Sequence, residues 1–504
     1  MQAEYTNNSK KTPATPETRK ALYGNMGKTI EMFSPILRQQ IILQESLNKN
    51  ELNPKSEIFN AFISLSIFSH YTNIELAAVL RACFRADLPA EKRYNIKWIN
   101  CVILEAYKHL YGYGKKIKNS LWMSEVKQAL RVYNDPELTQ ELNDLELYII
   151  EFGEKKITDK KKRDLSFHYD LDPISVYNML IELSEEDEVQ RLISFMKLLD
   201  KIYIFISKHI GKYNITINNK YDGFSKYAFT LFELDIFHNK KDLLLSESEK
   251  IIQNNSQLLD EFILHQNIPA KMVQYFKKID EESIASIYRL TEIEKVAMQL
   301  TFLYIDLASA LRSFLTSEYV IERQLSLKQV NTIIYEGFNK LYLLSKNSED
   351  SFWNMYICPL MSKTEDRFVL EKFNSLNIEL QNLKPNIISY SDQRQLSVHL
   401  DKGISETYSM LHNMNPFEEL RKSLLVFNFL PELLEFLTMC LRVVGLNSQI
   451  IHENKMASTY EQIDKIVELL KKSPDSQQKY DLIGKMKKIK TGELFDEIMK
   501  KKRK

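Results

Sequence analysis

The sequence predicts an all-α protein made of two tandem homologous helical bundles, with a helical connector between them and a helical extension after them. The first observation is the small number of turn-forming residues. Twelve glycines and 13 prolines among 504 residues are too few for a protein built from many tight turns. The second is that long stretches place apolar residues three and four positions apart, the spacing of one helix face. The third is an internal repeat whose equivalent residues differ in number by 231, as Trp122 and Trp353 do.

The repeat aligns without a gap from residue 74 to residue 188 of the first copy. Its first stretch, residues 74–81, matches residues 305–312 and ends in an arginine in both copies. Chance does not supply so many identities at a single offset, so we interpret the pattern as a tandem duplication. Identical pairs further along are Lys97 and Lys328, Asn100 and Asn331, Glu105 and Glu336, Tyr177 and Tyr408, and Glu188 and Glu419.

Each copy is expected to contain five helices. The first is apolar along most of its length, the second is amphipathic, and the last is again strongly apolar. The fourth is short and directly follows a polar segment that carries an arginine and a histidine. The expected ranges in the first and second copies are 57–86 and 288–317, 92–113 and 323–345, 136–152 and 367–383, 173–182 and 404–412, and 186–208 and 417–445.

The remaining parts of the chain are more polar than the two copies. The connector has short helical patches, of which residues 246–264 are the clearest, and the extension ends in the basic run 500–504. That run is interpreted as a solvated helix end, with an arm that contacts phosphates as the alternative. The predicted organisation is a polar N-terminal segment 1–50, a first domain 51–212, a connector 213–286, a second domain 287–446 and a basic extension 447–504.

Composition excludes several classes of protein. The net charge is +1, so binding of a nucleic acid would need locally clustered lysines and arginines. Cys83, Cys101, Cys358 and Cys440 form no CxxC pair, which argues against a zinc site and against a disulfide framework. The chain has no Walker loop, no GxGxxG and no HExxH or GxSxG motif, so nucleotide-binding, zinc-protease and hydrolase functions have no support.

The sequence also predicts a cytoplasmic protein that does not bind membranes. Residues 1–20 are polar and do not resemble a signal peptide. The most apolar stretch, residues 423–446, contains one proline and several charged residues, which favours a buried helix over a membrane span.

One short motif recurs at the offset of the repeat. It reads Arg163-Asp-Leu-Ser-Phe-His168 in the first copy and Arg394-Gln-Leu-Ser-Val-His399 in the second. Of the nine histidines, only this pair is retained between the copies. Because five residues of a helix turn through about 500°, the arginine and the histidine point in different directions and suit a pair that meets across a groove or at a helix entry.

These side chains are suited to cleaving RNA without a metal. An imidazole titrates near neutrality and can take a proton from a ribose 2′-hydroxyl or give one to a leaving oxygen. A guanidinium matches a phosphate with two hydrogen bonds and stabilises the charge that develops on it. Attack by the 2′-hydroxyl needs no metal and is possible only in RNA. We therefore expect neither a metal ion nor a cofactor.

An all-helical unit with a late Arg-x4-His motif resembles the HEPN superfamily, over roughly residues 57–208 and 288–445. Many members of that family are metal-independent ribonucleases of toxin, abortive-infection and RNA-guided antiviral systems. The resemblance implies that Arg163, His168, Arg394 and His399 line one composite catalytic cleft. The layout is also similar to that of type VI CRISPR effectors, although the chain is shorter and shows no separate guide-binding lobe.

The resemblance implies supporting roles for four further residues. Asp164 and Gln395 occupy the position after the arginine, which is usually polar in the family. Glu105 and Glu336 are candidates for orienting the arginines, and a solvated helix face is the alternative reading of both. RNA contacts are expected from the lysines beside the first motif, which are Lys160, Lys161 and Lys162.

The leading hypothesis is therefore an endoribonuclease whose two HEPN-like domains form a pseudo-dimer within one chain, as a monomer or a homodimer of such chains. By resemblance, its setting is prokaryotic antiviral defence or growth arrest, where a regulatory RNA or an inhibitory or activating protein would restrain it. The alternative is a non-catalytic helical scaffold that binds RNA or protein, in which the arginines and histidines are structural.

Overall fold

A computed structural model of the chain confirms the all-α fold class. Every element in the part of the chain that it describes is a helix, and no strand occurs there. The described residues are 15–47, 54–112, 114–133, 135–157, 172–210, 231–275, 281–342, 351–389, 404–471 and 477–491.

These helices fall into two compact units. The first unit holds Met1–His265 and Lys295–Glu435, and therefore includes helices from both halves of the chain. The second unit holds Gln266–Glu294 and Phe436–Lys504. Its described part includes the end of α16 (Pro416–Lys471) and all of α17 (Gln477–Thr491).

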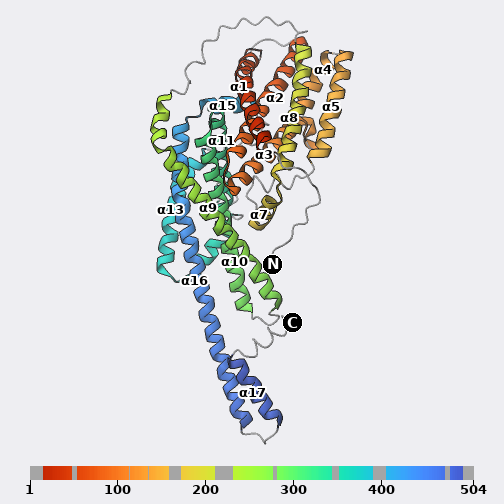
Figure 1. Cartoon of the computed structure of the whole chain (residues 1–504). Coiled ribbons are helices and arrows are strands. Elements are labelled where there is room, and N and C mark those ends of the chain that lie inside the picture. The colour runs from red at the N-terminus through yellow and green to blue at the C-terminus, as the bar shows by residue number, and fades with distance from the viewer. Residues whose placement is uncertain are drawn as a thin grey trace. The chain divides into compact units, whose positions relative to one another are not determined.

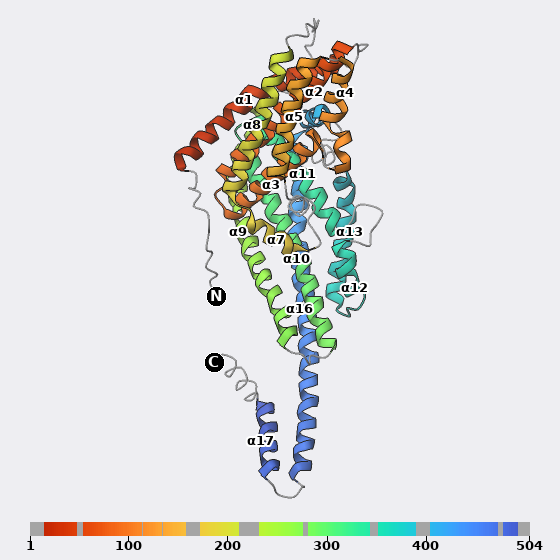
Figure 2. The same ribbon diagram turned by 90° about the vertical axis from the view of Figure 1, so that its right-hand side faces the viewer.

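In the first half of the chain, α2 (Pro54–Arg85) is the central helix (Figures 1 and 2). It packs along α1 (Pro16–Leu47), α3 (Pro89–Leu110) and α8 (Glu185–Ile210). Helix α5 (Pro136–Lys156) packs on α8. Because α2 is surrounded on several sides, most of its side chains are buried, which agrees with an apolar pattern that runs around the whole helix.

Five of the described helices of this half begin at a proline, for a common physical reason. Pro89, Pro136 and Pro173 each occupy the first turn of α3, α5 or α7 (Pro173–Glu182). Proline has no N–H group to leave unpaired there, and its fixed φ angle suits a helix. At α5, the side chain of Asp135 also accepts a hydrogen bond from the Leu138 N–H at 3.0 Å, which caps the helix.

The helices of the second half recur at the offset of the sequence repeat. Helices α3, α5 and α7 begin 231 residues before α11, α13 and α15, and the first residues of α8 and α16 differ by the same number. Even a short π-helical turn appears twice, at Trp122–Val126 and Trp353–Ile357. The second-half elements are α10 (Glu281–Thr316), α11 (Val320–Leu341), η5 (Trp353–Ile357), α12 (Cys358–Met361), α13 (Arg367–Ile388) and α15 (Ile404–Asn413). The remaining first-half elements are η1 (Gly114–Asn119), η2 (Trp122–Val126) and α4 (Lys127–Tyr133).

Two segments are more helical than the sequence predicts. Residues 16–47, grouped with the polar segment 1–50, form α1, whose buried Ile30, Phe33, Leu37 and Ile41 make one narrow stripe. A stripe of this width is hard to recognise in a sequence because the polar residues around it dominate the average. The connector contains α9 (Leu231–Tyr275), a single continuous helix where short patches were expected.

The last predicted helix is also longer than expected, since α16 continues past residue 445 to Lys471. Its segment Glu419–Val444 is the one candidate membrane span found in the described residues, by length and composition. Of the most apolar window in that segment, 44% is buried inside the protein. A buried core helix passes the same test, so this finding is weak evidence for a membrane.

Burial of one histidine predicts a loss of stability in acid. His70 of α2 is fully buried beside the rings of Phe33 and Tyr203, and Gln40 Oε1 lies 2.8 Å from its Nδ1. Burial lowers the pKa of His70 from 6.5 to about 4. The unfolded chain therefore binds a proton that the folded chain does not, and stability falls between pH 6.5 and about 4, by about 3 kcal/mol at the lower end.

Urea unfolding of wild type and His70→Gln at pH 7 and pH 4.5 measures this contribution. We expect the variant to lose less stability than wild type between the two pH values, whatever its stability at pH 7. His265→Gln is the matched control, because His265 is exposed. Equal losses in wild type and His70→Gln would contradict the assignment.

Candidate functional site

Both Arg-x4-His motifs lie outside the described residues, at equivalent places in the chain. Helix α5 ends at Lys156 and α7 begins at Pro173, so the first motif lies on the connection between these helices. Helix α13 ends at Ile388 and α15 begins at Ile404, which gives the second motif the same position. The predicted site residues in these two segments are Lys160, Lys161, Lys162, Arg163, Asp164, His168, Arg394, Gln395 and His399.

The two candidate glutamates are described, and both are buried. Glu105 near the end of α3 is 6% exposed, and Glu336 at the equivalent place on α11 is 3% exposed. Lys108 Nζ donates to Glu105 Oε2 at 3.0 Å. The interpretation of these glutamates as a solvated helix face is therefore wrong. A buried carboxylate is costly unless cations or hydrogen-bond donors compensate it, so these positions have a specific polar environment.

Two buried ion pairs join the halves in a reciprocal way. Lys328 Nζ of α11 lies 2.7 Å from Glu75 Oε1 of α2. Lys97 of α3 pairs with Asp306 of α10. Lys97 and Lys328 are equivalent in the repeat, as are Glu75 and Asp306. Each lysine therefore contacts the acid of the opposite half, which is the pattern produced by a two-fold axis.

A second reciprocal set uses arginine. Arg81 Nε of α2 donates to Glu322 Oε1 of α11 at 2.7 Å. Arg312 Nε of α10 donates to Glu91 Oε2 of α3 at 3.2 Å. The two arginines are equivalent at the offset of 231, and so are the two glutamates. All eight side chains of the two sets are at most 9% exposed, so the halves meet through a desolvated polar interface.

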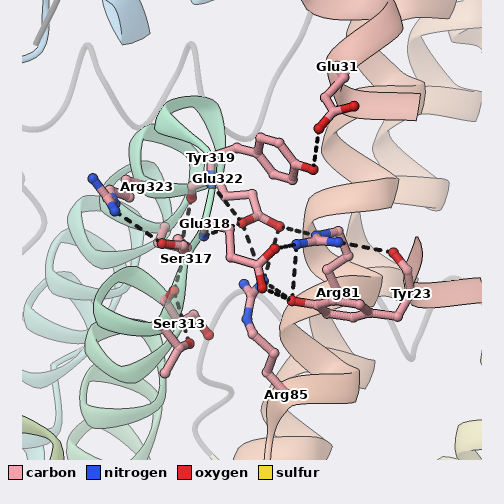
Figure 3. A network of polar contacts seen from close by, with 12 residues as sticks. Tyr23, Glu31, Arg81, Arg85, Ser313, Ser317, Glu318, Tyr319, Glu322 and Arg323 are labelled. Carbon is pink, nitrogen blue, oxygen red and sulfur yellow. Dashed lines mark hydrogen bonds and ion pairs between the residues drawn. The ribbon is translucent and has the colours of Figure 1, made fainter. Parts of the chain in front are cut away.

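Figure 3 shows the more elaborate of the two arginine sites. The Arg81 guanidinium lies between two rings, with its carbon 3.9 Å from the Tyr23 centroid and 4.9 Å from the Tyr319 centroid. Glu318 and Glu322 accept hydrogen bonds from it. Such stacking and charge pairing suit the planar guanidinium. The site thereby ties α1, α2 and the start of α11 together.

A glycine lets α1 approach this network. A Cβ atom added at Gly27 would lie 2.8 Å from Arg81 Nη1 and 2.9 Å from the Tyr319 hydroxyl. Both separations are shorter than van der Waals contact, so any larger residue would displace the arginine or the tyrosine. The close approach of α1 is therefore part of the same site.

A polar contact inside each half also recurs. In the first half, Arg191 of α8 donates to Asn100 of α3 and to Glu188. In the second half, Asn331 Nδ2 donates directly to Glu419 Oε2 at 2.9 Å. Asn100 and Asn331 are equivalent in the repeat, and so are the two glutamates. The recurring identities of the sequence thus correspond to recurring buried contacts.

Comparison with known proteins gives no further assignment. No protein-family model, no curated protein and no solved structure matches this chain. Within the described ranges, no group of three or more His, Cys, Asp or Glu side chains is arranged to hold a metal ion.

Proposed function

We propose that the two halves are copies of one ancestral unit, and that the chain is a metal-independent endoribonuclease of the HEPN type. The observation that carries the proposal is the reciprocity of the ion pairs, in which Lys97 contacts Asp306 and Lys328 contacts Glu75. Reciprocal contacts of this kind arise between two like units related by a two-fold axis. They support a pseudo-dimer within one chain.

The two Arg-x4-His motifs lie at equivalent places in the two halves of this pseudo-dimer. The first lies between α5 and α7 in the sequence and the second between α13 and α15, and both are placed at the offset that relates the ion pairs. In a two-fold arrangement, equivalent segments can face each other across the axis. We propose that Arg163 and His168 form one half of a composite cleft, and that Arg394 and His399 form the other half.

The proposed reaction is an intramolecular transfer of the phosphodiester. One histidine takes the proton of the 2′-hydroxyl, whose oxygen then attacks the adjacent phosphorus. The bond from phosphorus to the 5′-oxygen breaks, and the second histidine gives that oxygen a proton. The arginines hold the phosphate and stabilise the charge on its equatorial oxygens. The products are a 2′,3′-cyclic phosphate and a 5′-hydroxyl, and no electrons are transferred.

The buried Glu105 and Glu336 would orient the arginines and would not touch the RNA themselves. Asp164 and Gln395, which follow the arginines in the sequence, would be further supporting residues. Lys160, Lys161 and Lys162 would contact the RNA backbone near the first motif. We propose a cytoplasmic role in antiviral defence or growth arrest, in which a regulatory RNA or protein restrains the enzyme.

The test of this function is cleavage of labelled RNA by excess purified protein in EDTA. We expect cleavage to continue in EDTA and to leave cyclic-phosphate and 5′-hydroxyl ends, because the nucleophile belongs to the substrate. The control substrate has one 2′-deoxy nucleotide at the cleaved position and should remain intact there. Cleavage that stops in EDTA and returns with Mg²⁺, or that proceeds equally in the deoxy control, would overturn the proposed chemistry.

A further inference from the structure

A cavity of about 360 Å³ lies in the first unit between the start of α3 and helices α7, α9 and α10. Its size is at the lower end of the range for small-molecule sites. Helix α7, which forms one wall, begins at Pro173, only five residues after His168. A ligand in this cavity would therefore contact the helix that directly follows the first motif.

Aromatic rings from three helices line the cavity. They belong to Tyr94 of α3, Tyr177 of α7 and Phe302 of α10. Aliphatic side chains, among them Ile181 and Ile305, complete the apolar walls. Tyr94 and Phe302 are buried in the walls, and Tyr177, which is half-buried, provides a ring on which a planar ligand can stack.

The polar residues of the cavity form one edge. Gln253, Ser256 and Asp260 are three and four positions apart on α9, so they share one face of that helix. The Tyr177 hydroxyl donates to Asp260 Oδ1 at 2.9 Å, which fixes one end of this edge. Amide, hydroxyl and carboxylate groups together can both donate hydrogen bonds and accept them.

The charges around the cavity nearly cancel. Arg93 and Asp260 both line it and have opposite signs, and the carboxylate of Asp306 is already paired with Lys97. A strongly anionic or cationic ligand would leave its charge uncompensated. Aromatic walls, one mixed hydrogen-bonding edge and little net charge together suit a planar heterocycle.

The residues of this polar edge are not repeated at the equivalent positions of the chain. At the offset of 231, Gln253 and Asp260 correspond to Leu22 and Thr29 of α1, and Leu88 of the cavity corresponds to Tyr319. In the second half, Tyr319 stacks on Arg81 (Figure 3). The edge therefore differs in composition from its equivalent on α1, which has Leu22, Asn25 and Thr29 in place of Gln253, Ser256 and Asp260.

We propose that this cavity binds a nucleobase, presented either by a free nucleoside or by an unstacked position of an RNA strand. The second source rests on the proposed ribonuclease function, whereas binding of a free nucleoside does not. Stacking on Tyr177 supplies affinity, and the edge of α9 distinguishes one base from another.

Saturation-transfer NMR of the full chain with adenosine, guanosine, cytidine and uridine tests the site directly. We expect at least one nucleoside to bind, and Ile181→Trp, which fills the cavity, to weaken that binding about tenfold or more. Asn178→Trp is the matched control, because Asn178 is exposed on the same helix and does not line the cavity. The variant Gln253→Leu, which introduces the residue found at the equivalent position of α1, should bind nucleosides but discriminate less between bases.

Cleavage assays with RNA distinguish the nucleobase-site proposal from the ribonuclease proposal. Oligonucleotides that differ in one base should be cleaved with a preference for the base bound as a nucleoside, and Ile181→Trp should remove that preference. Nucleoside binding without any RNA cleavage would leave the cavity assignment standing and count against the ribonuclease. Cleavage without nucleoside binding, or equal binding by wild type and Ile181→Trp, would overturn the nucleobase site alone.

Discussion

Replacing Glu322 with alanine is expected to lower the free energy of unfolding by about 3–5 kcal/mol, because it removes the buried carboxylate that Arg81 and Arg85 share. Glu322 Oε1 accepts from Arg81 Nε at 2.7 Å and from Arg85 Nη1 at 3.2 Å, and its side chain is 1% exposed. The second oxygen accepts from the backbone N–H groups of Glu318 and Tyr319 at the start of α11. One substitution therefore removes an ion pair between the halves and the cap of a helix.

Glu371→Ala is the matched control for this loss. Glu371 pairs with Arg367 at 2.9 Å, but its side chain is 63% exposed. An exposed pair one helical turn apart contributes about 0.3–0.5 kcal/mol. Urea or guanidinium unfolding of both variants measures the difference. If the two substitutions cost the same, the buried interface is not what holds the halves together.

The equivalent substitution Glu91→Ala should cost less than Glu322→Ala, although it removes the same residue of the repeat. Glu91 accepts from Arg312 at 3.2 Å, whereas Glu322 accepts from two arginines and from two backbone N–H groups. Burial also raises the pKa of Glu91, and this effect is larger than the lowering of the pKa by the neighbouring Arg312. Its charge is therefore less favourable in the folded protein than a well-compensated carboxylate would be.

Much of the fold could be predicted because local signals mark its helices. Predicted segment 173–182 has the same limits as α7, where Pro173 supplies a start signal. Helix α1 was missed because its buried stripe is one residue wide along much of the helix and is surrounded by polar side chains. The paired π-helical turns were not predicted either, since apolar periodicity does not distinguish them from ordinary helix.

The contacts between the halves could be predicted from the sequence only in part. Lys97 and Lys328 stand out as charges retained at equivalent positions of the two amphipathic helices. Their partners could not be identified, because Glu75 and Asp306 lie on other helices, and the approach of those helices is set by packing between distant segments. The site itself depends on geometry between two motif segments that lie outside the described residues, so its assignment remains a prediction.

Alanine at His168 or at His399 is expected to reduce RNA cleavage in EDTA by roughly 10²- to 10⁴-fold, the usual contribution of a positioned acid or base. Each histidine serves one end of the reaction in the proposed cleft, so neither can replace the other. The double variant should be little worse than the weaker single variant, because residues that act as a unit are not additive. His265→Ala, which removes a histidine that has no equivalent in the repeat, should cleave like wild type.

Mixing the two single variants distinguishes a cleft within one chain from a cleft between chains. If His168 and His399 of one chain form the site, every molecule in the mixture lacks one of them, and activity stays at the level of the variants. If the motifs of two chains combine, a quarter to a half of the paired sites would be intact, and activity would return as the mixture forms. The reciprocal ion pairs are made within one chain, so we expect no recovery. Recovery of activity would show that the composite site forms between the two chains of a homodimer. Unaltered cleavage in both single variants would show that these histidines do not carry out the reaction.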